Sequence, residues 1–167
     1  VYSVVDPVFL IDKEEWELFA DKASCEYNDY ILYYALRNDE TLIKQTEKIA
    51  KENNCKILCI HPTGNKLNIN GKQLYNIGPC EFVKLIRDAR IVSTNSFHAM
   101  AFSIIFNKKI IVFPPEGLSS RITNLTEKLK LNDIIYNSFS EIKTARYKNS
   151  INYTNANKLL LKYREES

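Results

Sequence analysis

The sequence predicts an α/β fold, a Rossmann-like doubly wound parallel sheet. Apolar runs of strand length alternate along the chain with segments of helical periodicity. This order is typical of parallel strands joined by right-handed crossovers. The chain has 167 residues, of which 45% are hydrophobic. That is enough for one domain with its own core.

The N-terminal segment reads as a connector. The apolar, β-branched stretch from Val1 to Leu10 predicts a strand or the edge of a linker. Asp12, with Glu15 three residues later, predicts an N-cap and capping box for a helix over Lys13–Lys22.

The start of the chain leads to a prediction about domains. The chain begins at Val1, without Met, and enters an apolar stretch directly. We therefore expect a piece of a longer protein. Residues 1–28 would be a connector strand and helix from a missing N-terminal domain, and residues 29–167 the Rossmann-like domain.

The run from Tyr30 to Leu36 is apolar throughout, as expected for a central parallel strand covered on both faces. Asp39 predicts the N-cap of a helix that ends at Asn53-Asn54. The same alternation then continues to the end of the chain. It predicts strands over Lys56–Ile60, Arg90–Thr94 and Ile110–Phe113, helices from Pro79 to Asp88, Ser96 to Phe106, Ser120 to Leu129 and Asn155 to Glu165, and a short last strand at Ile134-Ile135.

Charge and hydropathy argue against two classes of partner. Lys and Arg number 23 against 20 Asp and Glu, for a formal net charge of +3, and the two signs are interleaved. This is a mildly basic solvated surface, with no nucleic-acid footprint. No apolar run approaches the roughly 20 residues of a membrane-spanning helix. The pattern leaves open a peripheral membrane association of the full protein.

The cysteines show no disulfide framework. Cys55, Cys59 and His61 would share one face of a strand, which raises a zinc cluster as one reading and buried structural thiols as the other. Residues two apart along a strand lie about 7 Å apart. Cys59 and His61 therefore suit a shared metal ion poorly. We expect no metal, no cofactor, reduced thiols and a cytoplasmic location.

Ligands of doubly wound sheets bind outside the carboxyl ends of the strands. The richest such place is Ser93–His98, where a buried strand turns into a helix. The first N–H groups of a helix lack internal partners and favour an anion. His98 is off the apolar stripe of that helix, so it can face a pocket. The alternative is that Asn95 or Ser96 is only a helix cap and His98 a surface residue.

The other strand ends offer weaker candidates. Ser120 and Arg121 follow Ser119 at a helix start, where an Arg can clamp a carboxylate or phosphate. The alternative is an exposed Arg121 paired with Glu116 or Glu127. Arg37 follows the first strand. His61 reads as structural or loop-lining.

Three segments resemble the polysaccharide pyruvyl transferase family, in the family's order. Val5–Trp16 is similar to its "DP-x-(F/L)-L-L-(D)-x-E-x-W" segment, Thr94–Phe106 to "T-D-S-F-H-G-T-A-F-S-I-I-F", and Ser119–Leu125 to "S-S-R-I-x-D-L". The chain departs from the pattern at Asn95, where Asp is usual, and at Ala99, where Gly is usual. Asn95 removes a charge beside the anion site, and Ala99 crowds a close backbone approach.

The resemblance implies a fold like the two-domain GT-B glycosyltransferases, with this chain as the C-terminal, donor-binding half. It implies phosphoenolpyruvate as donor, and as acceptor a glycan or lipid-linked sugar of a bacterial surface polysaccharide. The product would be a pyruvate ketal. The helix start at Ser96-Phe97 and Arg121 would hold the phosphate and carboxylate of the donor, with Ser120, Asn95 and Arg37 as further contacts. His98 would donate a proton or contact the phosphate. We expect little turnover from this chain alone.

Two other functions fit the same pattern. A GT-B nucleotide-sugar glycosyltransferase would use the same helix start for a diphosphate, with Glu116 as the candidate ribose-binding carboxylate. A non-catalytic α/β binding domain would have no small-molecule affinity and would tolerate substitution at His98 and Arg121.

Overall fold

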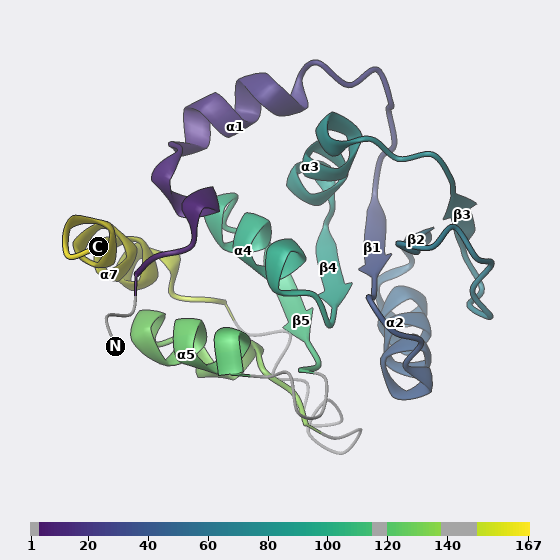
Figure 1. Ribbon diagram of the computed structural model, residues 1–167. Helices are drawn as coiled ribbons and strands as arrows, with labels where there is room; N and C mark the ends of the chain where they lie inside the picture. The colour runs from purple at the N-terminus through teal and green to yellow at the C-terminus, as the bar shows by residue number, and fades with distance from the viewer. Residues whose placement is uncertain (1–3, 115–119, 138–149) are drawn as a thin grey trace.

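The computed structural model describes residues 4–114, 120–137 and 150–167, which form a parallel sheet with helices on both faces (Figure 1). The sheet has five strands in the order β3-β2-β1-β4-β5, and every pairing is parallel. The strands are β1 Tyr30–Tyr34, β2 Lys56–Ile60, β3 Lys72–Leu74, β4 Ile91–Thr94 and β5 Lys109–Val112.

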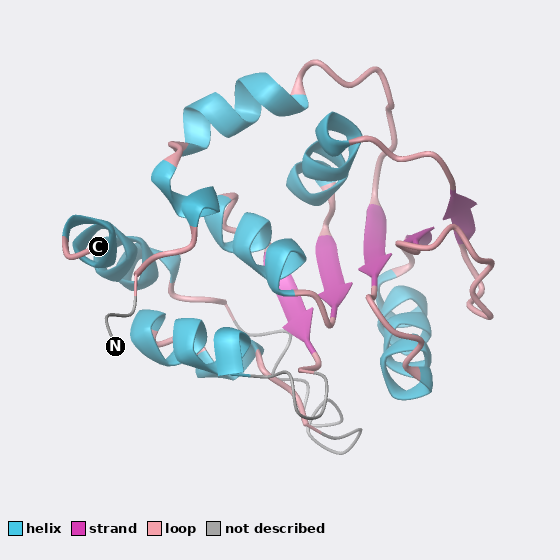
Figure 2. Cartoon of the chain, viewed as in Figure 1, coloured by secondary structure: helices cyan, strands magenta, loops and turns pink. Residues whose placement is uncertain are grey.

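The helices fill the connections between the strands (Figure 2). Capping residues predicted from the sequence start two of them, since Asp39 accepts the Leu42 N–H at 3.0 Å and Ser96 accepts the Ala99 N–H. The α-helices are α1 Lys13–Ala20, α2 Glu40–Asn53, α3 Pro79–Asp88, α4 Phe97–Ile105, α5 Ser120–Leu129 and α7 Tyr153–Glu165, and the 3-10 helices are η1 Pro7–Leu10 and η2 Asn132–Ile134.

The sheet separates two apolar layers. Tyr30 and Leu32 of β1 pack into the layer that contains α3 and α4, whereas Ile31 and Tyr33 pack into the layer that contains α2. In Figure 1, α3 and α4 lie on one side of the sheet and α2 on the other. β1 is the middle strand of the five, so the central position predicted for it is confirmed. Strands buried on both faces are apolar without alternation, as this one is.

Three neighbouring strands end at the same level. Tyr34 of β1 lies opposite Ile60 of β2 and Thr94 of β4 in the register. The residues that follow these positions therefore share one edge of the sheet, the carboxyl edge, toward which the arrows of β1 and β4 point in Figure 1.

The N-terminal segment differs from the prediction. The stretch predicted as a strand or linker edge contains η1, with Asp6 as its cap. The helix predicted over Lys13–Lys22 ends at Ala20, and the side chain of Asp12 makes no cap hydrogen bond. Asp12 instead pairs with Arg164 of α7 at 2.9 Å. Asp12 is at the N-cap position of α1, as predicted, but the predicted capping hydrogen bond from its side chain is absent because the carboxylate faces Arg164.

The connector segment packs closely on the rest of the molecule. Phe9 is buried, and the Trp16 ring meets Phe102 of α4 at 4.8 Å between centroids. The Val5 N–H donates to Ser167 Oγ at 2.9 Å, so the two ends of the described chain lie side by side. The division at residue 28 stays a proposal.

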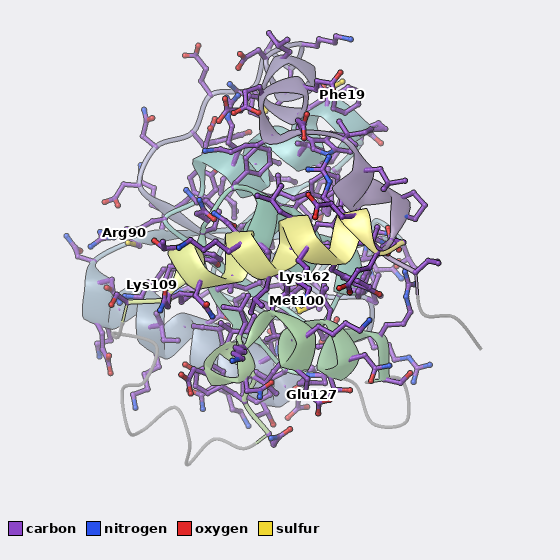
Figure 3. The ribbon with its side chains drawn as sticks, turned by 90° about the vertical axis from the view of Figure 1, so that its left-hand side faces the viewer. Phe19, Arg90, Met100, Lys109, Glu127 and Lys162 are labelled. Carbon is purple, nitrogen blue, oxygen red and sulfur yellow. The ribbon has the colours of Figure 1, made fainter. Side chains whose placement is uncertain are left out.

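Two further differences concern short strands. β3 was not predicted, because Lys72–Leu74 carries no apolar run. The last strand predicted at Ile134-Ile135 is reduced to η2 and one parallel bridge between Ile135 and Val112. This bridge lies at the outer side of β5, where a sixth strand would add. Figure 3 shows α7 beside α5 on the surface near this edge.

Candidate functional site

The strand order changes direction between β1 and β4. β1 leads through α2 on one face of the sheet, and β4 leads into α4 on the other. Ligands of doubly wound sheets bind at the carboxyl edge beside such a switch point. The residues that follow the two strands at this edge are Leu36–Arg37 after β1 and Asn95–His98 after β4.

The Asn95 side chain joins the loop after β1 to the segment after β4. Its Oδ1 accepts the Leu36 N–H at 2.7 Å, and its Nδ2 donates to the Arg37 carbonyl oxygen at 3.2 Å. The side chain is 3% exposed. Both ends of the amide are therefore committed to the backbone, and Asn95 positions the loop after β1.

The start of α4 is built from buried hydroxyls. Thr94 Oγ1 donates to the Tyr34 carbonyl at 2.6 Å and accepts the Ser96 N–H at 2.9 Å. Ser96 is buried and accepts the Ala99 N–H at 3.5 Å. In the described parts of the chain, the N–H groups of Phe97 and His98 have no hydrogen-bond partner. They are the two donors that remain for an anion at the positive end of the helix.

His98 and Arg121 flank the same aromatic ring. The Arg121 guanidinium carbon lies 4.1 Å from the Phe97 ring centroid, and the His98 ring centroid lies 5.6 Å from it in an edge arrangement. His98 is the one exposed residue of α4. The structure thus brings together the imidazole, the guanidinium and the helix start.

Arg121 has a partner that the sequence did not predict. Its Nη2 pairs with Asp6 Oδ2 at 2.5 Å, and the Asp6 side chain is only 17% exposed. Among the described residues Arg121 pairs with Asp6 and not with Glu127. Glu116, the other expected partner, and Ser119 lie outside the described residues. A cavity of about 290 Å³ adjoins the pair, lined by Asp6, Arg121 and Phe97 among others, and His98 does not line it.

The remaining predicted residues take no part in this cluster's contacts. Arg37 and Ser120 are exposed, and the Ser120 carbonyl oxygen accepts from Thr123 Oγ1 at 3.2 Å. Arg37 engages Asn95 through its carbonyl alone.

His61 is a further residue at the carboxyl edge, which the sequence predicts to be structural or loop-lining. His61 follows β2 directly and lines an open cleft of about 650 Å³ between the ends of β1, β2 and β3 and the start of α3. The signal was available, because the rule that picked Ser93–His98 applies equally to a His one residue beyond a buried strand.

The zinc reading finds no support among the described residues, where no three His, Cys, Asp or Glu side chains are close enough to hold a metal ion. Cys59 is buried, and burial raises its pKa to about 12. The Cys55 thiol instead contacts Arg90 and Asp29, at 3.2 and 3.6 Å. Among the helices of residues 4–114, 120–137 and 150–167, none is both long and apolar enough to cross a bilayer.

The sheet order and the parallel pairing together define an α/β domain of the doubly wound, Rossmann-like class. The family model for polysaccharide pyruvyl transferases matches residues 1–117. The chain belongs to the polysaccharide pyruvyl transferase family. The match includes Asp6 and the Thr94–Phe106 segment and ends before α5.

A comparison with solved structures supports the fold. UDP-GlcNAc 2-epimerase from Methanocaldococcus jannaschii is similar, with a TM-score of 0.53 at 16% sequence identity, over 83% of this chain and 43% of that chain. At this identity the likeness concerns the fold alone, and the predicted Rossmann-like, GT-B-like fold is confirmed. This chain spans less than half the length of that protein. A search of curated proteins finds no match.

Proposed function

We propose that this chain is the donor-binding half of a pyruvyl transferase that uses phosphoenolpyruvate. The enolpyruvyl group would move onto two hydroxyls of one sugar in a glycan or lipid-linked acceptor, forming a pyruvate ketal and releasing phosphate. Family membership supports the transfer of a pyruvyl group. One observation carries the position of the donor: the unpartnered N–H groups of Phe97 and His98, beside the exposed His98 ring, at the switch point of the sheet.

The donor carries two anionic groups, and the site offers two kinds of contact. The phosphate accepts hydrogen bonds from the N–H groups of Phe97 and His98, where the helix dipole favours negative charge. Arg121, on the Phe97 ring, meets the carboxylate. A guanidinium has five N–H donors, and one of those on Arg121 engages Asp6. Because Asp6 offsets its charge, Arg121 orients the donor more than it attracts it.

The reaction needs one proton at carbon 3 of the donor. His98 donates that proton as a general acid while the first sugar hydroxyl adds to carbon 2. The second hydroxyl then adds to carbon 2, and the bond from carbon 2 to the phosphate oxygen breaks with its electron pair going to phosphate. One hydroxyl proton restores His98 and the other leaves with phosphate. Histidine suits this role because it gains and loses a proton near neutral pH.

Calorimetric titration of this chain with phosphoenolpyruvate and with UDP tests the donor. We expect phosphoenolpyruvate to bind and UDP not to bind. His98→Ala and Arg121→Ala should each weaken binding about tenfold, the effect of one charge-assisted hydrogen bond. Arg90→Ala is the matched control, since Arg90 is also an exposed Arg paired with an Asp, Asp29 at 3.0 Å, but precedes β4 at the opposite edge.

Other outcomes would reject the proposal. UDP binding in place of phosphoenolpyruvate would favour a nucleotide-sugar glycosyltransferase. Binding of neither ligand would favour a non-catalytic domain. Turnover is measured in the full-length protein, because we expect little turnover from the donor-binding half alone. There, near-normal turnover of His98→Ala would reject its role as the acid, and a loss confined to donor affinity would reduce it to a phosphate contact.

A further inference from the structure

His61 lines a cleft, called here the β2 cleft, at the carboxyl edge of the sheet. The proposed donor site at Phe97, His98 and Arg121 is at the same edge, but none of these three residues lines the β2 cleft. The cleft is lined by residues after β1, β2 and β3, including Tyr34, His61, Thr63, Tyr75, Asn76 and Phe82. Its volume of about 650 Å³ is in the range of small-molecule sites. The donor chemistry proposed above does not use it.

His61 is held in one orientation by its own loop. The Thr63 N–H lies 3.2 Å from His61 Nδ1, and Thr63 Oγ1 lies 2.7 Å from the same atom. Because an amide N–H only donates, Nδ1 is the acceptor and the neutral ring carries its proton on Nε2. Across residues 4–114, 120–137 and 150–167, Nε2 has no protein partner. His61 thus offers one oriented N–H donor.

The cleft is aromatic and carries no fixed charge. Tyr75 is 51% exposed, and the Tyr34 ring lies 4.9 Å from Phe82 between centroids. Burial raises the pKa of Tyr34, so its hydroxyl stays a neutral group. None of the lining residues, all within the described chain, is Lys, Arg, Asp or Glu.

An anion at the nearby helix start is disfavoured. A Cβ added to Gly78, the N-cap of α3, would lie 2.6 Å from Glu81 Oε2, so this carboxylate already folds over the positive end of the helix. The cleft therefore suits an uncharged ligand with a ring face for Tyr75 and hydroxyls for His61, Thr63 and Asn76.

We propose that the β2 cleft is a saccharide-binding subsite, in which His61 Nε2 donates to a sugar hydroxyl and Tyr75 stacks against the sugar ring. His61 and Asn95 follow strands on either side of β1, about 10 Å apart. A sugar in the β2 cleft would therefore be a neighbour of the donor. Its use as the acceptor subsite rests on the proposed function, whereas the binding of a saccharide does not.

Amide NMR titration of the full chain tests the subsite, with the methyl glycosides of glucose, galactose, mannose and N-acetylglucosamine as probes. We expect at least one of them to shift the amide signals of His61, Thr63 and Tyr75. His61→Ala and Tyr75→Ala should each weaken this binding about fivefold, the effect of one lost neutral contact. Dispersed spectra establish that both variants fold, since both side chains lie outside the core.

His98→Ala is the matched control and separates the two proposals. It should weaken phosphoenolpyruvate binding about tenfold and leave sugar binding unchanged, whereas His61→Ala should weaken sugar binding about fivefold and leave phosphoenolpyruvate binding unchanged. The subsite is overturned if no glycoside shifts these amides, if the shifts cluster elsewhere, or if phosphoenolpyruvate or inorganic phosphate shifts the His61 amide instead.

Discussion

Asn95 illustrates what a residue's place in the sequence predicts and what it leaves open. The rule on strand ends places Asn95 at the carboxyl edge of the sheet, and the structure has it directly after β4. The rule could not tell that two backbone groups of the loop after β1 would take both ends of the amide. Those partners, Leu36 and Arg37, lie 59 and 58 residues earlier in the chain. Only the register of β1 with β4 reveals the contact.

Replacement of Asn95 should therefore affect stability. Asn95→Ala leaves the Leu36 N–H and the Arg37 carbonyl without their partner. We expect the free energy of unfolding to fall by about 2 kcal/mol. Urea denaturation measures this. Asn124→Ala, at an exposed position on α5, is the control and should cost nothing. Equal urea midpoints for the two variants would contradict a stabilising role for the Asn95 hydrogen bonds to Leu36 and Arg37.

Arg121 is a second case in which position alone was insufficient. Its place at the start of α5 was predicted, but its Asp6 partner lies 115 residues away. The two residues belong to separate segments of the family resemblance, and nothing local in either segment indicates that they meet. The folded chain joins them through η1, which rests on α4.

Elements with a strong local signal were predicted well. The bounds of β2, α3 and α5 match the expected ranges. An apolar run marks β2, and Pro79 marks α3 because proline favours the first position of a helix. β3 lacks such a signal. Lys72–Leu74 is a strand because it pairs with Leu58–Ile60 of β2, and this pairing is tertiary.

Gly71 permits that pairing. A Cβ there would lie 2.8 Å from Cys59 Sγ and 2.9 Å from the Ile57 carbonyl oxygen, so the two strands approach too closely for a side chain. Gly71→Ala should destabilise the protein by about 3 kcal/mol through overpacking.

The control for this variant is Gly64→Ala. Gly64 has open space around it but a φ of +70°, so we expect only a backbone cost of about 1 kcal/mol. Urea denaturation compares the two. A larger loss at Gly64 than at Gly71 would show that space beside β2 is not the constraint.

At the scale of the whole molecule, the order of strands and helices predicted the fold class, and the structure confirms it. Alternation of strand and helix was sufficient because right-handed crossovers leave few topologies. The packing of the first segment on α4 and α7 was not predictable, since it depends on ion pairs and ring contacts between distant parts of the chain.

A buried thiol and buried tyrosine hydroxyls make the free energy of unfolding of the whole molecule depend on pH in the alkaline range. In the unfolded chain the Cys59 thiol ionises near its ordinary pKa of 9.0, whereas burial raises this pKa to about 12 in the folded protein. Between these values the folded state holds more protons, so rising pH lowers the free energy of unfolding. Burial also raises the pKa of Tyr30, Tyr33 and Tyr153, which adds to the same trend.

We therefore expect stability to fall as pH rises from about 9, with the loss continuing toward about 12. Urea denaturation at a series of pH values measures it. Cys59→Ala should flatten the part of the curve due to this thiol. An unchanged pH dependence in that variant would assign the loss to the tyrosines.

The ion pair between Asp6 and Arg121 couples the N-terminal segment to the start of α4. Asp6 caps η1, and Arg121 rests on the ring that begins α4. If the segment before Pro7 swings away from α5, the guanidinium loses its counter-ion and its full positive charge faces Phe97. The position of the segment around Asp6 would thus set how much of the positive charge of Arg121 is available to a bound anion.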